Sequence, residues 1–151
     1  MSFRYLVSAV VLVLAFPSFV QGEEPSAVGR VKVVSGSAFL MRENQSVFAH
    51  VGQPVFEGDT LRTGTTGRIG VTLKDDTRVA LGPASELRLD RYVYAPAEGR
   101  LGLALKIVRG VAAYVSGQIA KLSPDSVRLE TPASIVGVRG TTLVFRVDPA
   151  S

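Results

Sequence analysis

Hydrophobic and polar residues alternate along most of the chain, and the alternation is most regular near its middle. RIGVTL (residues 68–73) and RVALG (78–82) each place apolar side chains at every second position, and KDDT separates them. Side chains alternate between the two faces of a β-strand, so this period of two indicates strands with one buried face. Two strands folding over the Asp75-Asp76 turn are therefore expected.

The next segments continue the same alternation. Inward positions are predicted for the apolar residues Leu87, Leu89, Leu101, Leu103, Leu105 and Ile107. Gly110 is expected to break the chain before VAAYV (111–115), because glycine often marks the end of a strand.

The two ends of the chain are also rich in strand signals. VGRVKVV (28–34) and SAFLMR (37–42) are split by Ser35-Gly36, and a polar turn at 43–45 follows, which predicts hairpins. Thr131-Pro132 is expected to introduce a final pair of strands, in which Leu143, Phe145 and Val147 alternate with Val144 and Arg146.

Together these signals predict an all-β fold. Roughly a dozen short strands with tight connections indicate a compact sandwich or roll, and a twisted β-solenoid is the alternative that periodicity leaves open. Helix is a minor component, because Gly117 interrupts the one candidate segment, AYVSGQIAKL (113–122).

The first 22 residues are typical of a secretory signal peptide. One basic residue precedes an apolar run from Tyr5 to Phe16, Pro17 follows, and small residues end the segment at Gly22. The run is shorter than the roughly 20 residues of a membrane-spanning helix, so cleavage after Gly22 is expected. We predict a signal peptide at 1–22, a leader at 23–27 and one domain at 28–148, in a periplasmic or secreted protein. An uncleaved signal segment would be its one membrane attachment.

The composition excludes some classes of partner molecule and of functional site. The formal net charge is +4, and the arginines are spread along the chain rather than clustered. A nucleic-acid groove needs a basic stripe with stacking aromatic residues, so no nucleic-acid partner is expected. The chain has no cysteine, which excludes disulfides, thiol catalysis and Cys-based metal sites.

Candidate catalytic and metal-binding residues have simpler interpretations. His50 is the single histidine, without a nucleophile elbow, and a surface or packing role at a strand end is favoured over an enzyme pairing it with an acid. Asp59 in Glu57-Gly58-Asp59 is expected to accept hydrogen bonds in a turn, and no calcium-loop spacing is present. GTTGRIG (64–70) lacks the lysine of a phosphate loop and leads into a strand, so we interpret it as a turn. No catalytic residue, cofactor or metal is predicted.

Three phrases in order, GQPVFEGDTLRTGTTGRIGVTLKDDTRVALGPASELRL, LALKIVRGVAAYV and TPASIVGVRGTTLVFRV, resemble the FecR domain over about residues 28 to 148. The motif residues that carry the resemblance are Gly58, Asp59, Thr63, Gly64, Thr131, Pro132, Gly137, Val138, Arg139, Gly140 and Thr141.

The resemblance implies an exported, all-β, non-catalytic module for binding or signal relay in the bacterial cell envelope, with an envelope protein as its partner. In the founding proteins the domain belongs to a regulator that controls a cytoplasmic sigma factor. Here no cytoplasmic region precedes the apolar segment and no domain follows Val147, so we expect a single domain without the anti-sigma region. The alternative is a cell-wall or glycan-binding accessory protein, for which Tyr92, Tyr94 and Tyr114 would supply the stacking surfaces.

Arg139 is the charged residue whose role the sequence leaves most open. It stands between glycines in an apolar segment, so it is exposed, paired inside the domain or in contact with a partner. An internal pair is favoured, with Asp59 as its expected carboxylate, because arginine forms bidentate contacts with carboxylates.

Overall fold

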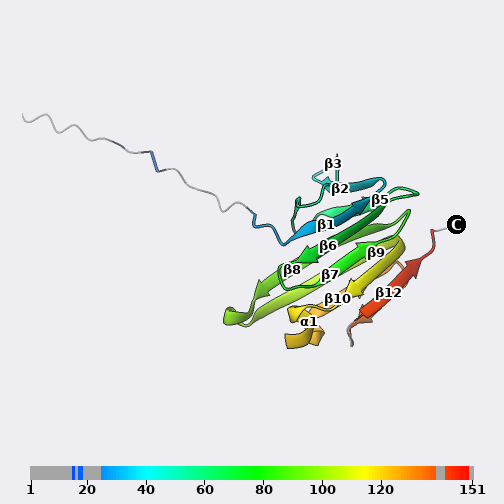
Figure 1. Cartoon of the computed structure of the whole chain (residues 1–151). Helices are drawn as coiled ribbons and strands as arrows, with labels where there is room; N and C mark the ends of the chain where they lie inside the picture. The colour runs from blue at the N-terminus through cyan, green and yellow to red at the C-terminus, as the bar shows by residue number, and fades with distance from the viewer. Residues whose placement is uncertain (1–14, 16, 19–24, 139–141, 150–151) are drawn as a thin grey trace, which may run out of the picture.

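The computed structural model describes residues 15, 17–18, 25–138 and 142–149. This part of the chain forms a curled sheet of twelve strands, with one short α-helix and two 3-10 turns (Figure 1). The strands are β1 (Gly29–Ser35), β2 (Ala38–Arg42), β3 (Gln45–Phe48), β4 (Pro54–Val55), β5 (Thr60–Thr63), β6 (Arg68–Leu73), β7 (Arg78–Leu81), β8 (Glu86–Ala95), β9 (Arg100–Val115), β10 (Val127–Glu130), β11 (Ile135–Gly137) and β12 (Thr142–Val147). The helix is α1 (Gln118–Leu122), and the 3-10 turns are η1 (Pro96–Glu98) and η2 (Pro124–Ser126). The all-β roll predicted from the sequence is confirmed.

Strand β9 joins the two layers of the roll. Its first half pairs with β8 and, in parallel, with β10, whereas its second half pairs with β7 and β12. We call the strands β4, β1, β6, β7, the second half of β9 and β12 layer A. The strands β3, β2, β5, β8, the first half of β9, β10 and β11 form layer B.

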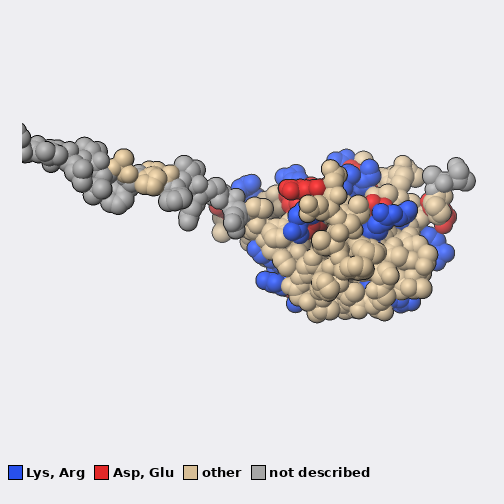
Figure 2. Space-filling view, turned by 90° about the horizontal axis from the view of Figure 1, so that it is seen from above, with Lys and Arg blue, Asp and Glu red and all other residues tan. Residues whose placement is uncertain are grey.

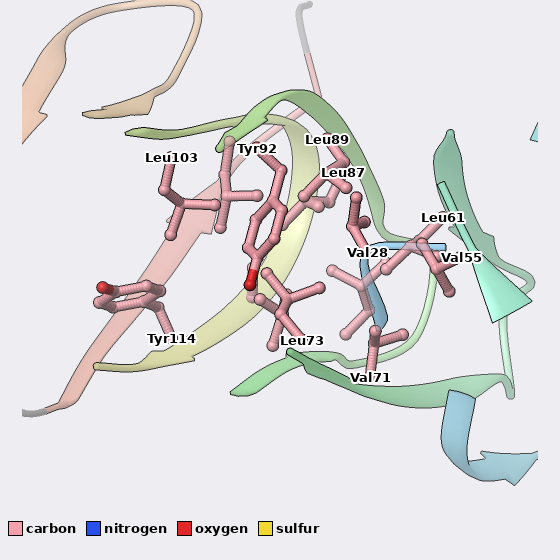
Figure 3. Packing of buried hydrophobic residues seen from close by; sticks show 14 of the residues in the cluster. Val28, Val55, Leu61, Val71, Leu73, Leu87, Leu89, Tyr92, Leu103 and Tyr114 are labelled. Carbon is pink, nitrogen blue, oxygen red and sulfur yellow. The ribbon is translucent and has the colours of Figure 1, made fainter. Parts of the chain in front are cut away.

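The core lies between the layers and is built from the alternating apolar positions. Ile69, Val71 and Leu73 of β6 are buried, as are Leu87 and Leu89 of β8. Figure 3 shows Val71 and Leu73 of one layer facing Leu87, Leu89 and Tyr92 of the other. The predicted alternation therefore identifies which face of β6 and of β8 is buried.

The first expected hairpin is wrong. β1 pairs with β4 and β6, and β2 pairs with β3 and β5, so β1 and β2 belong to different layers. The Ser35-Gly36 segment is a corner at which the chain crosses from layer A to layer B. By contrast, β2 and β3 form the hairpin expected over the polar turn at Glu43-Asn44.

Gly110 does not end a strand, contrary to expectation. β9 continues through this residue, which has a φ of +83° and pairs with Val147. A Cβ atom at Gly110 would lie 2.2 Å from Ser85 Oγ, so the bend requires glycine both for its conformation and for the close approach. The bend at Gly110 turns β9 from layer B into layer A.

The two strands expected after Thr131-Pro132 are present as β11 and β12, but they pair with β10 and β9 and not with each other. The predictions for the segments around Asp75-Asp76 and Gly117 hold. β6 and β7 form the predicted hairpin over Asp75-Asp76, and Asp76 takes a positive φ of 68°. The helix α1 begins directly after Gly117 and has five residues. No helix in the described ranges is long and apolar enough to cross a membrane.

Candidate functional site

The predicted motif residues fall into two groups in space. Gly58 and Asp59 lie in the turn before β5, whereas Thr63, Gly64 and Pro132 line two adjoining hollows at the opposite end of β5. The motif residues Gly137 and Val138 lie at the end of β11, where Val138 is buried. Arg139, Gly140 and Thr141 lie outside the described residues, so the predicted role of Arg139 stays a prediction.

The two hollows form one groove beside the bend of β9. Their volumes are about 710 and 640 Å³, and both are lined by Arg109 and by the segment Arg146–Pro149. Arg62, Thr63, Gly64 and Pro83 line the first hollow, and Pro132 lines the second. We call this surface the arginine groove and define it by Arg62, Arg109, Arg146, Thr63, Gly64, Pro132 and Asp148.

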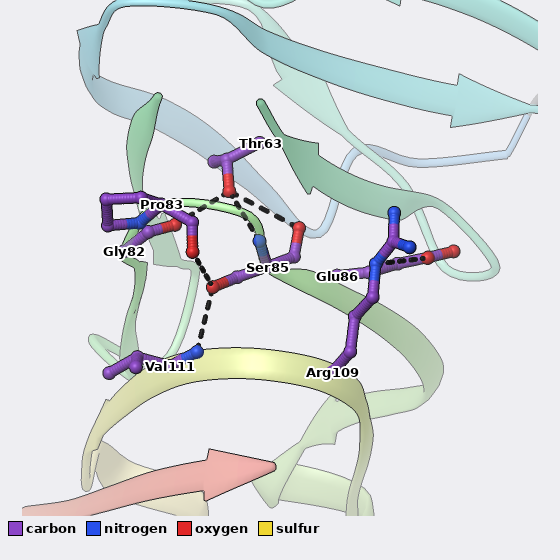
Figure 4. Close-up of polar contacts among 7 residues, drawn as sticks. All are labelled: Thr63, Gly82, Pro83, Ser85, Glu86, Arg109 and Val111. Carbon is purple, nitrogen blue, oxygen red and sulfur yellow. Dashed lines mark hydrogen bonds and ion pairs between the residues drawn. The ribbon is translucent and has the colours of Figure 1, made fainter. Parts of the chain in front are cut away.

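A hydrogen-bond network fixes one wall of the arginine groove (Figure 4). The Thr63 hydroxyl donates to the Gly82 carbonyl at 2.7 Å and accepts the Ser85 amide at 2.9 Å. The Ser85 hydroxyl donates to the Pro83 carbonyl and accepts the Val111 amide at 2.8 Å. The predicted motif residue Thr63 thus ties β5 to the turn before β8, and Ser85 ties that turn to the bend of β9.

The arginines of the groove have little internal pairing. Arg109 lies opposite Glu86, with 3.6 Å between Arg109 Nε and Glu86 Oε2, and its Nε is buried without a hydrogen-bond acceptor in the described part of the chain. Neither the Arg62 nor the Arg146 side chain makes a hydrogen bond or an ion pair with any described residue. A guanidinium without an internal acceptor can donate to a ligand carboxylate or carbonyl.

Asp59 forms the bidentate arginine pair that the sequence predicted, but its partner is Arg42. Arg42 Nε and Nη2 donate to the two Asp59 oxygens at 2.8 and 2.7 Å, and the guanidinium lies 4.3 Å from the centre of the Phe56 ring. The Asp59 side chain is 1% exposed and also accepts the Phe56 amide, as expected of a turn residue. The hydrogen bond to Asp59 raises the pKa of Arg42 above its ordinary value. Asp59, the carboxylate expected to pair with Arg139, is therefore paired with Arg42.

Asp75 is the centre of a second buried polar group, which sequence analysis interpreted only as a hairpin tip. Its carboxylate accepts the Thr77 hydroxyl at 2.7 Å, the Tyr92 hydroxyl at 3.0 Å and the Ile119 amide at 3.1 Å. We call Asp75, Thr77, Tyr92 and the Ile119 amide the Asp75 cluster. Burial, followed by the nearby Asp75 charge, raises the pKa of the Tyr92 phenol. The cluster joins the β6–β7 turn to β8 and to the start of α1.

The sugar-stacking surfaces proposed for a glycan-binding protein are mostly inaccessible. Tyr92 is 8% exposed and Tyr114 is 2% exposed, so neither ring can lie against a sugar. Tyr94 is half-buried. This part of the sequence interpretation is wrong because both rings fill positions between the layers (Figure 3).

The candidates for catalysis and metal binding lie apart from the arginine groove. His50 is exposed, two residues after β3, and its backbone amide donates to Gln53. Among the described residues, no three His, Asp or Glu side chains are grouped so that they could hold a metal ion. Figure 2 shows basic side chains distributed around the outline of the face in view, with broad uncharged areas between them.

Comparison with known proteins identifies a family. The model of the family described as FecR protein matches residues 59–151, which is more than half of the chain. No curated protein matches. Among solved structures, a chain described as a cell surface anchoring domain aligns with 29% identity and a TM-score of 0.39, over 40% of this chain and 82% of that one.

Proposed function

The chain belongs to the FecR protein family, and on that premise we propose that it is an exported, non-catalytic module that binds a partner protein or relays a signal in the bacterial cell envelope. Residues 1–22 would be the signal peptide, 23–27 a leader and 28–148 the working domain. The sequence of residues 1–22 supports export, since a short apolar run is followed by Pro17 and small residues.

One observation carries the proposal. The arginine groove brings the motif residues Thr63, Gly64 and Pro132 together with Arg62 and Arg146, whose side chains have no partner among the described residues. A concave surface with a few converging polar groups is the usual form of a binding site. The rigid Thr63–Ser85 network beneath it would hold the groove in shape before a partner arrives.

Site-specific photocrosslinking in the native envelope tests this function. A benzoylphenylalanine in place of Thr65, at the wall of the groove, is expected to give a protein adduct of defined mass. The double variant Arg62→Ser and Arg146→Ser should lose that adduct while it melts like the parent. The control position is Glu98, at the far end of the β8–β9 hairpin. An adduct that persists in the double variant, or one that also forms from Glu98, would contradict binding at the groove.

Export has a separate test. N-terminal sequencing of the protein recovered from an envelope fraction should give Glu23 or a close neighbour, whereas a retained Met1 would argue against cleavage.

A further inference from the structure

The outer face of layer A carries a continuous row of small apolar residues. In the strand register, Val33 lies opposite Gly70, Gly70 opposite Ala80, Ala80 opposite Ala113 and Ala113 opposite Val144. The row therefore crosses five strands, β1, β6, β7, β9 and β12. Gly70, Ala80 and Ala113 point away from the core, since their chain neighbours Ile69, Val71, Val79, Leu81, Ala112 and Tyr114 are buried. Val33 and Val144 are themselves exposed.

The middle of this row is recessed. A shallow hollow of about 180 Å³ lies over Gly70, Ala80 and Ala113. Val33 and Val144, at the two ends, are 57% and 70% exposed. We call the surface formed by Val33, Gly70, Ala80, Ala113 and Val144 the apolar trough.

Cations flank the apolar trough on both sides. On one side Arg78 stands on β7 opposite Thr72, and Lys32 lies at the bulge of β1. On the other side Arg68 of β6 lies opposite Ser35, and Arg146 of β12 lies opposite Val111. The residues of these flanking rows are Arg30, Lys32, Thr72, Arg78, Val115 and Thr142 on the first side, and Ser35, Arg68, Val111 and Arg146 on the second, with no acidic residue among them.

We propose that the apolar trough docks an acidic amphipathic segment of a partner protein. Its apolar side chains would enter the recess over Gly70, and its carboxylates would meet the flanking arginines. Five neighbouring strands span about 19 Å, which matches about six residues of extended chain or about 13 residues of helix. The apolar trough shares no residue with the arginine groove, but its second flanking row does, because Val111 and Arg146 also line the first hollow.

Two other occupants fit the surface less well. A second copy of the chain would bring two sets of cations face to face, and like charges at an interface are unfavourable. An anionic bilayer surface would attract the flanking cations. However, Gly70, Ala80 and Ala113 have no side chain long enough to enter the lipid. Charge and shape together therefore favour an anionic segment with its own apolar side chains.

Fluorescence anisotropy with two labelled model peptides tests the proposal. One is a 13-residue peptide of Leu and Glu in an amphipathic pattern, and the other has Lys in place of each Glu. We expect the full chain to bind the acidic peptide in preference to the basic one, with affinity that falls as salt increases. The double variant Ala80→Glu and Ala113→Glu should bind the acidic peptide at least about tenfold more weakly. Ser46→Glu, on the exposed strand β3, is the matched control and should bind like the parent.

A membrane surface or a second copy of the chain in the trough would give different results from an acidic segment. Equal binding of both peptides, or an unaffected double variant, would overturn the proposal. Binding to phosphatidylglycerol vesicles without binding to the acidic peptide would overturn it in favour of a membrane. A parent dimer that the double variant dissociates, seen by sedimentation velocity, would overturn it in favour of self-association. If the double variant fails to fold, Arg68→Gln with Arg78→Gln replaces it, and the same loss is expected.

Photocrosslinking identifies the natural occupant. With benzoylphenylalanine in place of Val144, mass spectrometry of the envelope adduct should show a segment with net negative charge and apolar residues. A net basic segment or a lipid adduct would overturn the proposal.

Discussion

The Asp75 cluster and the arginine groove both hold charged groups at the margin of the core, but they differ in how those groups are satisfied. Every donor around Asp75 comes from the fold itself, from Thr77, Tyr92 and Ile119. In the groove, the Arg62 and Arg146 side chains have no partner among the described residues, and Arg109 Nε has no hydrogen-bond acceptor there. A charge satisfied within the fold contributes to stability, whereas a donor without an acceptor is available to a ligand. Stability and binding should therefore respond to different substitutions.

The largest loss of stability is expected from Asp75→Ala. The variant leaves the Thr77 and Tyr92 hydroxyls and the Ile119 amide without their acceptor in a buried position, which should cost about 3 to 6 kcal/mol of unfolding free energy. Urea unfolding followed by circular dichroism measures it. Asp76→Asn is the matched control on the exposed neighbouring residue, which should change stability by less than about 0.5 kcal/mol. Equal effects at both positions would mean that the cluster does not hold the turn.

Gly110→Ala should have the next largest effect, because it forces a side chain into the bend beside the arginine groove. The positive φ and the Cβ contact with Ser85 should together cost about 2 to 4 kcal/mol. Gly137→Ala is the control in a strand where an added Cβ would meet no atom of the described residues within 4 Å. Thermal melts of both variants measure the difference, and a Gly110→Ala variant as stable as Gly137→Ala would show that the bend tolerates a side chain.

A smaller and pH-dependent effect is expected at Tyr92. Its folded-state pKa is raised above the ordinary value of 10.0, so the protonated phenol is favoured more in the folded than in the unfolded chain. This contribution is complete below pH ~10 and is lost as the pH rises further. Tyr92→Phe should therefore lose less stability between neutral and strongly alkaline pH than the parent does.

Phe48→Leu, at an exposed aromatic residue without a titrating group, is the control and should keep the parent slope. Some alkaline loss should remain in the Tyr92 variant, because burial also raises the pKa of Tyr114. The measurement is the unfolding free energy at a series of pH values. If it falls equally with pH in the parent and in Tyr92→Phe, the expectation is contradicted.

The smallest effect on stability is expected from Arg62→Ser. Arg62 has no ion pair in the described part of the chain, so its removal should change the unfolding free energy by less than about 0.5 kcal/mol. Chemical denaturation of the parent and the variant provides the measurement. A loss above about 1 kcal/mol would show that the arginine supports the fold and would remove the contrast with Asp75.

Local features of the fold could be predicted from the sequence, and long-range pairings could not. The β6–β7 hairpin follows from alternation on both sides of Asp75-Asp76, because its partners are adjacent in the chain. Ser35-Gly36 has the same turn chemistry, yet it is a corner, since the sequence does not show whether the next strand folds back or changes layer. Gly110 similarly bends β9 without ending it.

The same limit applies to the site. The motif correctly identified Asp59 as a carboxylate in a turn, but its partner Arg42 is set by the pairing of β2 with β5, in which Met41 lies opposite Thr60. The arginine groove gathers Arg62, Arg109 and Arg146 from three separate strands, and no spacing in the sequence predicts their proximity. The sequence has 17 lysine and arginine residues against 13 acidic residues, and this small excess does not indicate where the arginines meet.

Strand β9 also determines how the domain is expected to unfold. It pairs with β7 and β12 in layer A and with β8 and β10 in layer B. Detaching β9 therefore removes strand pairing from both layers. Unfolding is therefore expected to be cooperative, with amides in the two layers exchanging hydrogen at one common rate in their most protected positions. The strand that bends at Gly110 thus makes two sheets behave as a single folding unit.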